Sequence, residues 1–93
     1  MAESPLAQLP SLGPASAAAL ADVGIRDEVA LREAGVGGAF ALLRAQFGKR
    51  ITVNWIYALE CALRHLDWRL LEPERKAALR AEAGAIIAAL EGR

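Results

Sequence analysis

The fold is decided by the stretch Leu9–Ile25, LPSLGPASAAALADVGI, which predicts a tight turn followed by a short helix. The turn centres on Gly13, because glycine adopts backbone angles that residues with a Cβ avoid. Pro14 fits the first helical position, where no backbone donor is needed and the fixed φ suits the helix. Alanine-rich sequence continues the helix, since alanine has the highest helix propensity. Gly24 then fits the left-handed position that ends a helix, with Ile25 folding back onto the last turn.

This pattern resembles a helix-hairpin-helix element, in which two short helices flank a turn made of a hydrophobic residue and glycine. Ser4 and Pro5 fit the N-cap and the first residue of the first arm, which we expect over residues 5–9, with the second arm over 14–23. In DNA-binding versions of the element, amides at the start of the second helix hold a backbone phosphate. The resemblance therefore implies Leu12, Gly13 and Ser16 as candidate nucleic-acid contacts.

The composition describes one small domain. The 93 residues carry 11 basic and 11 acidic side chains, and 55% of them are hydrophobic, many being alanine. That length supports a single modest core. No stretch approaches the roughly 20 apolar residues of a membrane span, and the N-terminus lacks the pattern of a secretory signal. Because a lone Cys61 cannot form an internal disulfide, we expect a reducing compartment and a cytoplasmic protein.

Two short helices are predicted in the middle of the chain. Asp27 fits the N-cap of the first, and Gly35 ends it. The glycine pair Gly37-Gly38 marks a turn before the second helix. That helix runs from about residue 38 to Gly48.

Two longer helices are predicted after them. Thr52 fits the N-cap of a helix over residues 52–66, which we expect at the centre of the core, with Glu60 and Arg64 paired on its solvent side. Pro73 fits the first position of the last helix. Gly84 weakens that helix by roughly 1 kcal/mol relative to alanine, and a close crossing or a bend there would explain the glycine. The residues expected in the core recur at helical spacing: Phe40, Leu43, Phe47, Trp55, Leu59, Ala62, Leu63, Leu66, Leu79, Ala83, Ile86 and Leu90.

The fold class is therefore predicted as all-α, because no run of alternating β-branched residues occurs. We expect a compact bundle of five or six short helices that begins with the helix-hairpin-helix-like element. Trp68, in the connection before the last helix, is expected to fold back as a cover or to remain half exposed.

Taken in order, these pieces resemble the C-terminal domain of TfoX/Sxy-type proteins, known as regulators of bacterial competence. The matching residues are Leu12-Gly13-Pro14 with Ala17 and Leu20, Val23-Gly24-Ile25, Leu31 with Gly35-Val36, Trp55 with Ala58-Leu59-Glu60 and Ala62-Leu63, and Trp68-Arg69 before Pro73-Glu74-Arg75. The resemblance implies one compact helical domain over residues 1–93, of which residues 1–4 are expected to be loose. Longer family members carry a separate α/β N-terminal domain that this sequence lacks, so we expect a stand-alone domain. The family supplies no catalytic residues to transfer.

Candidate catalytic and metal-binding residues are few. Cys61 falls within an apolar helix, where a thiol behaves as a small hydrophobe. His65 is the only histidine, and a zinc site needs three or four ligands. Acidic pairs such as Asp27-Glu28 are explained by the starts of helices. We therefore expect no enzymatic activity, no cofactor and no metal.

Two functions remain as hypotheses. The first is a non-enzymatic regulatory or protein-interaction module similar to the TfoX C-terminal domain, which the resemblance links to competence or transcription regulation. Its partner is another protein or a second copy bound through the leucine- and alanine-rich last helix. Trp68 is its candidate partner contact, because exposed aromatic residues often anchor protein partners.

The alternative is a helix-hairpin-helix domain that binds the nucleic-acid phosphate backbone weakly and without sequence preference. Arg44, Lys49 and Arg50 form the densest basic group outside the last helix and complete the candidate contacts. Zero net charge favours the first hypothesis, because phosphate neutralisation supplies most non-specific affinity for DNA. Ser11 also stands where active hairpins often carry glycine, and Pro14 removes an amide.

Overall fold

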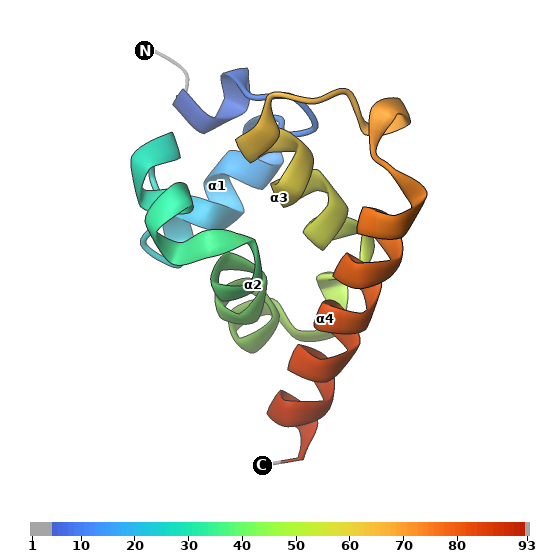
Figure 1. The fold of residues 1–93 in the computed structure, drawn as a ribbon. Helices are drawn as coiled ribbons and strands as arrows, with labels where there is room; N and C mark the ends of the chain where they lie inside the picture. Colours follow the sequence, from blue (N-terminus) through green and yellow to red (C-terminus); the bar gives the residue numbers. More distant parts are fainter. Residues whose placement is uncertain (1–4, 93) are drawn as a thin grey trace.

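The computed structural model describes residues 5–92, and every regular element in that range is helical (Figure 1). The elements are η1 (Pro5–Gln8), α1 (Pro14–Asp22), α2 (Glu28–Phe47), η2 (Gly48–Arg50), α3 (Asn54–Arg64), η3 (Trp68–Leu70) and α4 (Pro73–Glu91), where η marks a 3-10 helix. The predicted all-α class is confirmed. The predicted five or six helices are not, since the described residues form four α-helices. None of these helices is long and apolar enough to span a membrane.

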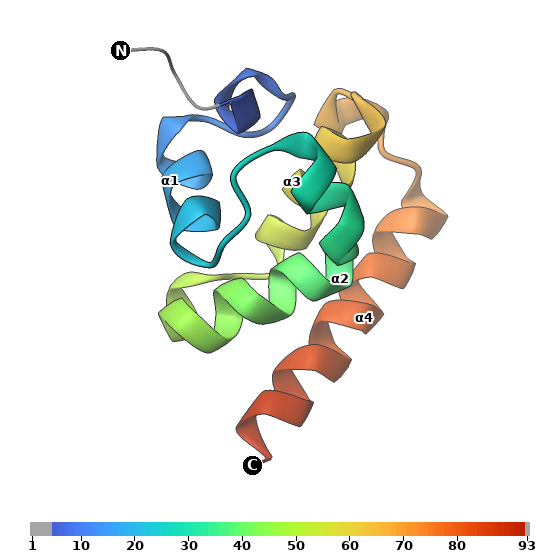
Figure 2. The same ribbon diagram turned by 90° about the vertical axis from the view of Figure 1, so that its left-hand side faces the viewer.

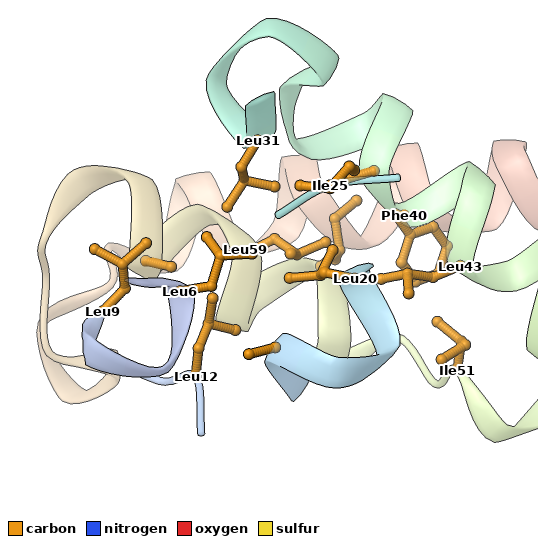
Figure 3. Close-up of a cluster of buried hydrophobic side chains, with 14 of the residues drawn as sticks. Leu6, Leu9, Leu12, Leu20, Ile25, Leu31, Phe40, Leu43, Ile51 and Leu59 are labelled. Carbon is orange, nitrogen blue, oxygen red and sulfur yellow. The ribbon is translucent and has the colours of Figure 1, made fainter. Parts of the chain in front are cut away.

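The helices surround one hydrophobic core. α2 packs against both α3 and α4, and α1 packs against η1 and α2. α1 and α4 lie on opposite sides of α3 (Figures 1 and 2). The last turns of α4 extend beyond the other helices (Figure 2). In the core, Leu6 and Leu20 from the N-terminal segment gather around Leu59 of α3 (Figure 3). Of the predicted core residues, these are buried: Phe40, Leu43, Leu59, Ala62, Leu79 and Ala83.

The decisive N-terminal stretch folds largely as its sequence predicts. Gly24 has φ +89°, and the amide of Ile25 donates to the carbonyl of Leu20 at 2.9 Å. The amide of Gly24 donates to the carbonyl of Ala21 at 3.0 Å, which completes a Schellman motif at the end of α1. The first arm, expected over residues 5–9, is instead a single 3-10 turn over Pro5–Gln8, which is shorter and more tightly wound than an α-helix. The proposed N-cap Ser4 and the expected loose residues 1–4 lie outside the described residues.

The middle of the chain differs from its prediction. The Asp27 carboxylate caps α2 by accepting from the amide of Ala30 at 2.8 Å, and Gly35 interrupts the helix with φ +78° and ψ 163°. Gly37-Gly38 is helical, so the predicted turn there is wrong. A Cβ on Gly37 would clash with the carboxylate of Glu82, because α4 passes close to this point of α2.

The sequence predicted a close crossing or a bend at Gly84, but the close approach of α4 to another helix lies at Gly37 of α2. A Cβ on Gly84 would meet no atom within 4 Å, and α4 continues through it as one helix. The predicted start of α3 is also wrong. The helix begins at Asn54, its N-cap residue is Val53, and no side chain caps it. On α3, Ile56 is fully buried, whereas Trp55, which was expected in the core, is only half-buried.

Glu60 contradicts its predicted place on the solvent side of α3, because only 7% of the residue is exposed. Its main partner is Arg75 of α4, and Arg64 lies 3.6 Å away. The sequence did not predict this burial, because a carboxylate is expected in solvent unless a cation pairs with it, and here that cation comes from another helix.

Candidate interaction groove

Two of the predicted nucleic-acid contacts serve the fold. Leu12 is buried in the core. The guanidinium of Arg44 donates to the carbonyl of Ile51 at 2.9 Å and to Glu91 at 3.2 Å, and only 12% of its side chain is exposed. Arg44 therefore ties the ends of α2 and α4 to the segment between α2 and α3.

The remaining predicted contacts lie on two separate elements. Gly13 precedes α1 in an extended conformation, and no side chain caps the first turn of that helix. Ser16 lines a shallow hollow of about 280 Å³ with Thr52, Asn54, Trp55 and Ala58. Lys49 and Arg50 are exposed in η2 and do not line this hollow.

A second and deeper groove adjoins that hollow along one face of α3. Its volume is about 360 Å³, and four parts of the chain supply its lining: Ser11 from the first turn, Asn54, Tyr57 and Ala58 from α3, Trp68 and Leu71 from the η3 connection, and Lys76 from α4. Asn54 and Ala58 border both depressions. The sequence indicated only one member of this set, Trp68, as a partner contact.

The η3 connection presents two large apolar side chains to solvent, and one of them, Trp68, lines this groove. Trp68 is 67% exposed and Leu70 is 66% exposed, so Trp68 is not the closed cover that was one expectation. Asp67 fixes the turn by accepting from the amide of Arg69 at 2.9 Å and from its guanidinium at 2.8 Å. These bonds lower the pKa of Asp67 to about 2, so the turn holds its form at neutral pH.

Tyr57 holds two cations of α4 beside the groove. The Nζ atom of Lys76 lies 5.3 Å from the centroid of the Tyr57 ring, which is a cation–π contact. The Nε atom of Arg80 donates to the Tyr57 hydroxyl at 3.1 Å. Within residues 5–92, neither Lys76 nor Arg80 has a carboxylate partner.

The neighbouring arginines are neutralised. Arg64 makes two bonds of 2.8 Å to Glu72, and Arg75 makes bonds of 2.8 and 3.1 Å to Glu60. The Arg64 guanidinium lowers the pKa of Glu72 to about 2. Beside the groove, the positive charge that lacks a counter-ion within residues 5–92 is therefore that of Lys76 and Arg80.

Cys61 and His65, the side chains best suited to catalysis or metal binding, both lie outside the groove lining. Cys61 is fully buried, and this burial raises the pKa of its thiol, which opposes nucleophilic use. His65 ends α3 in a left-handed conformation, with its Nε2 atom 3.1 Å from a carboxylate oxygen of Glu28. Across the described part of the chain, no three side chains of His, Cys, Asp or Glu gather to hold a metal ion.

Comparison with known proteins gives a family and one structural relative. The model of the TfoX C-terminal domain matches residues 2–83. A crystal structure of an uncharacterized protein from Listeria monocytogenes superposes with a TM-score of 0.78 at 27% identity, over 95% of this chain and 94% of that chain. No curated protein matches the sequence. Because the family model matches residues 2–83 of the 93, the chain belongs to the TfoX C-terminal domain family.

Proposed function

We propose that this protein is a non-enzymatic, regulatory protein-interaction module, and that the groove between α3, η3 and α4 binds its partner. The observation that carries the proposal is the large exposed side chain of Trp68, which lines the groove, together with the exposed Leu70 of the same η3 turn. Exposed aromatic residues beside a pocket are the usual anchors of protein interfaces. In this proposal the protein acts in the cytoplasm, where a free thiol such as Cys61 stays reduced.

The experiment is a selection of binding peptides from a random phage-displayed library on the immobilised protein. Peptides that bind the groove lose affinity with Trp68→Ala and with Leu70→Ala. Val29→Ala and Leu42→Ala are the matched controls, because both residues are exposed hydrophobics of α2 outside the groove lining. Selected peptides that bind all four variants equally would refute the groove as the binding surface.

A specific observation supports the alternative, a helix-hairpin-helix domain that binds phosphate backbone without sequence preference. Ser11, at the position where active hairpins often carry glycine, has φ +67°, in the left-handed region that glycine adopts most readily. The first turn of α1 also lacks a side-chain cap, which leaves amides there for an acceptor. Lys49 and Arg50 are exposed, and among the described residues neither has an ion-pair partner.

Titration with duplex and single-stranded DNA at low and at physiological salt tests this alternative. The variant is Lys49→Ala/Arg50→Ala, since Arg44 is needed by the fold. If both cations contact phosphates, the plot of log affinity against log salt is less steep for the variant, by roughly two in the magnitude of its negative slope. An unchanged slope, or no binding even at low salt, would refute the alternative.

A further inference from the structure

We infer that the partner of the groove is an acidic peptide segment, which packs a large apolar side chain against Trp68 and Leu71 and places a carboxylate beside Lys76 and Arg80. This inference rests on the proposed function and names the chemistry of the partner. It is carried by the arrangement of charge around Tyr57.

Lys76 and Arg80 occupy positions four residues apart on one flank of α4. Like charges at this spacing destabilise a helix by a few tenths of a kcal/mol, so helix stability does not explain the pair. Both side chains converge on Tyr57, one over its ring and one on its hydroxyl. Tyr57 itself lines the groove, so the two cations are held at its edge instead of extending freely into solvent.

These cations differ from the other basic side chains nearby. Arg64, Arg69 and Arg75 each pair with a carboxylate of this chain, as described above, whereas Lys76 and Arg80 have no such counter-ion among residues 5–92. A carboxylate from a partner would complete two charge-assisted hydrogen bonds, which are among the stronger polar contacts at an interface. The local charge therefore selects an anionic partner.

The lining next to the cations selects an apolar group. Trp68 and Leu71 form one side of the groove, and its volume of about 360 Å³ is at the lower end of those that enclose small ligands or anchor side chains. An aromatic or leucine side chain of the partner would bury Trp68 surface that is now exposed. A partner that presents an apolar anchor next to a carboxylate is an acidic, amphipathic peptide.

A nucleic acid fits this surface less well. Bases stack on aromatic rings such as Trp68, but single-stranded binders also carry a positive track along the phosphate backbone. Here the track would stop after Lys76 and Arg80, because the next arginines are neutralised within the chain.

The test uses the random peptide library on three proteins: the wild type, the variant Lys76→Glu/Arg80→Glu and the control Lys49→Glu/Arg50→Glu. The control reverses two exposed cations that do not line the groove. We expect wild-type peptides to be enriched in Asp or Glu next to Leu, Phe or Trp. Calorimetry on the best synthetic peptide should show at least about a tenfold loss of affinity with Lys76→Glu/Arg80→Glu and little loss with the control. Library peptides selected on the charge-reversed variant should be basic.

The outcomes separate the two proposals. Peptides that require Trp68 but show no acidic enrichment would overturn the acidic partner and leave the interaction module intact. A library that yields no peptide sensitive to Trp68→Ala or Leu70→Ala would overturn both. Tighter binding of single-stranded oligo(dT) than of any selected peptide would overturn the acidic peptide, as would a dimer in sedimentation that dissociates with Trp68→Ala. Circular dichroism of each variant shows whether its fold is retained.

Discussion

The carboxylate of Glu60 on α3 accepts two hydrogen bonds from the guanidinium of Arg75 on α4, at 2.8 and 3.1 Å. Glu60 is the only buried charged residue among residues 5–92. A charge in such a place is tolerated when it is paired and hydrogen-bonded, so this contact fixes the start of α4 against α3. It thereby also sets where Lys76, the next residue of α4, meets Tyr57.

Replacing the cation of this pair should destabilise the protein. Arg75→Ala leaves the Glu60 carboxylate buried with Arg64 at 3.6 Å as its remaining partner. We expect a loss of about 2 kcal/mol in the free energy of unfolding, since hydrogen bonds to charged groups are worth about that much. The cost stays below that of a fully buried pair because the Arg75 side chain is 44% exposed. Urea unfolding measures it, with Lys49→Ala as the control. Lys49 is exposed and has no ion-pair partner among the described residues, so its replacement should leave the midpoint unchanged.

Two glycines should respond in opposite directions to alanine. Gly84 lies inside α4 with open space around it, so Gly84→Ala should raise the free energy of unfolding by about 0.4–1 kcal/mol. Gly35 has φ +78° and ψ 163°, a conformation that is essentially restricted to glycine. Gly35→Ala should therefore lower the free energy of unfolding by roughly 1–3 kcal/mol. Equal effects of the two substitutions in thermal unfolding would contradict the break in α2.

Ser11 should be one position where glycine is no worse than the natural residue. Its φ of +67° strains a residue with a Cβ, while its side chain makes only a weak hydrogen bond with the thiol of Cys61. Ser11→Gly should therefore leave the free energy of unfolding unchanged or raise it by up to about 1 kcal/mol. Ser16→Gly, inside α1, is the control and should destabilise by about 0.5 kcal/mol through lower helix propensity. Denaturant midpoints of the two variants compare these effects, and a clear loss with Ser11→Gly would contradict the strained turn.

The ion pair between Glu72 and Arg64 should contribute to acid unfolding. In the folded protein the pKa of Glu72 falls from its ordinary value of 4.5 to about 2. A lowered folded pKa means that the pair stabilises the protein above about pH 4.5 and loses this effect as the pH falls toward 2. Glu72→Gln should therefore be less stable than the wild type at neutral pH and should converge with it near pH 2. A constant difference across denaturant midpoints at several pH values would contradict the pair.

Local sequence rules predicted the parts of the fold that local contacts determine. The Schellman motif at Gly24, the cap at Asp27 and the break at Gly35 each depend on residues within one turn. The helical class followed from the same signals together with the periodicity of residues such as Phe40 and Leu43.

The features that the sequence did not predict depend on distant partners. Gly37 lies inside α2 at the point where Glu82 of α4 comes close, and the residues next to Gly37 in the sequence give no sign of this contact. Glu60 was expected in solvent because its cation, Arg75, lies fifteen residues away on another helix. The groove was missed for the same reason, since Ser11 and Lys76 meet only after the chain has folded.

The central claim is that the groove between α3, η3 and α4 is a binding surface for an acidic, amphipathic segment. The most direct measurement is a nuclear magnetic resonance titration of the labelled protein with the tightest acidic peptide from the library. The account predicts chemical-shift changes concentrated at Tyr57, Trp68 and Lys76, including the indole signal of Trp68. Shifts confined to the start of α1 and to Lys49 and Arg50, or shifts spread evenly over the chain, would contradict it.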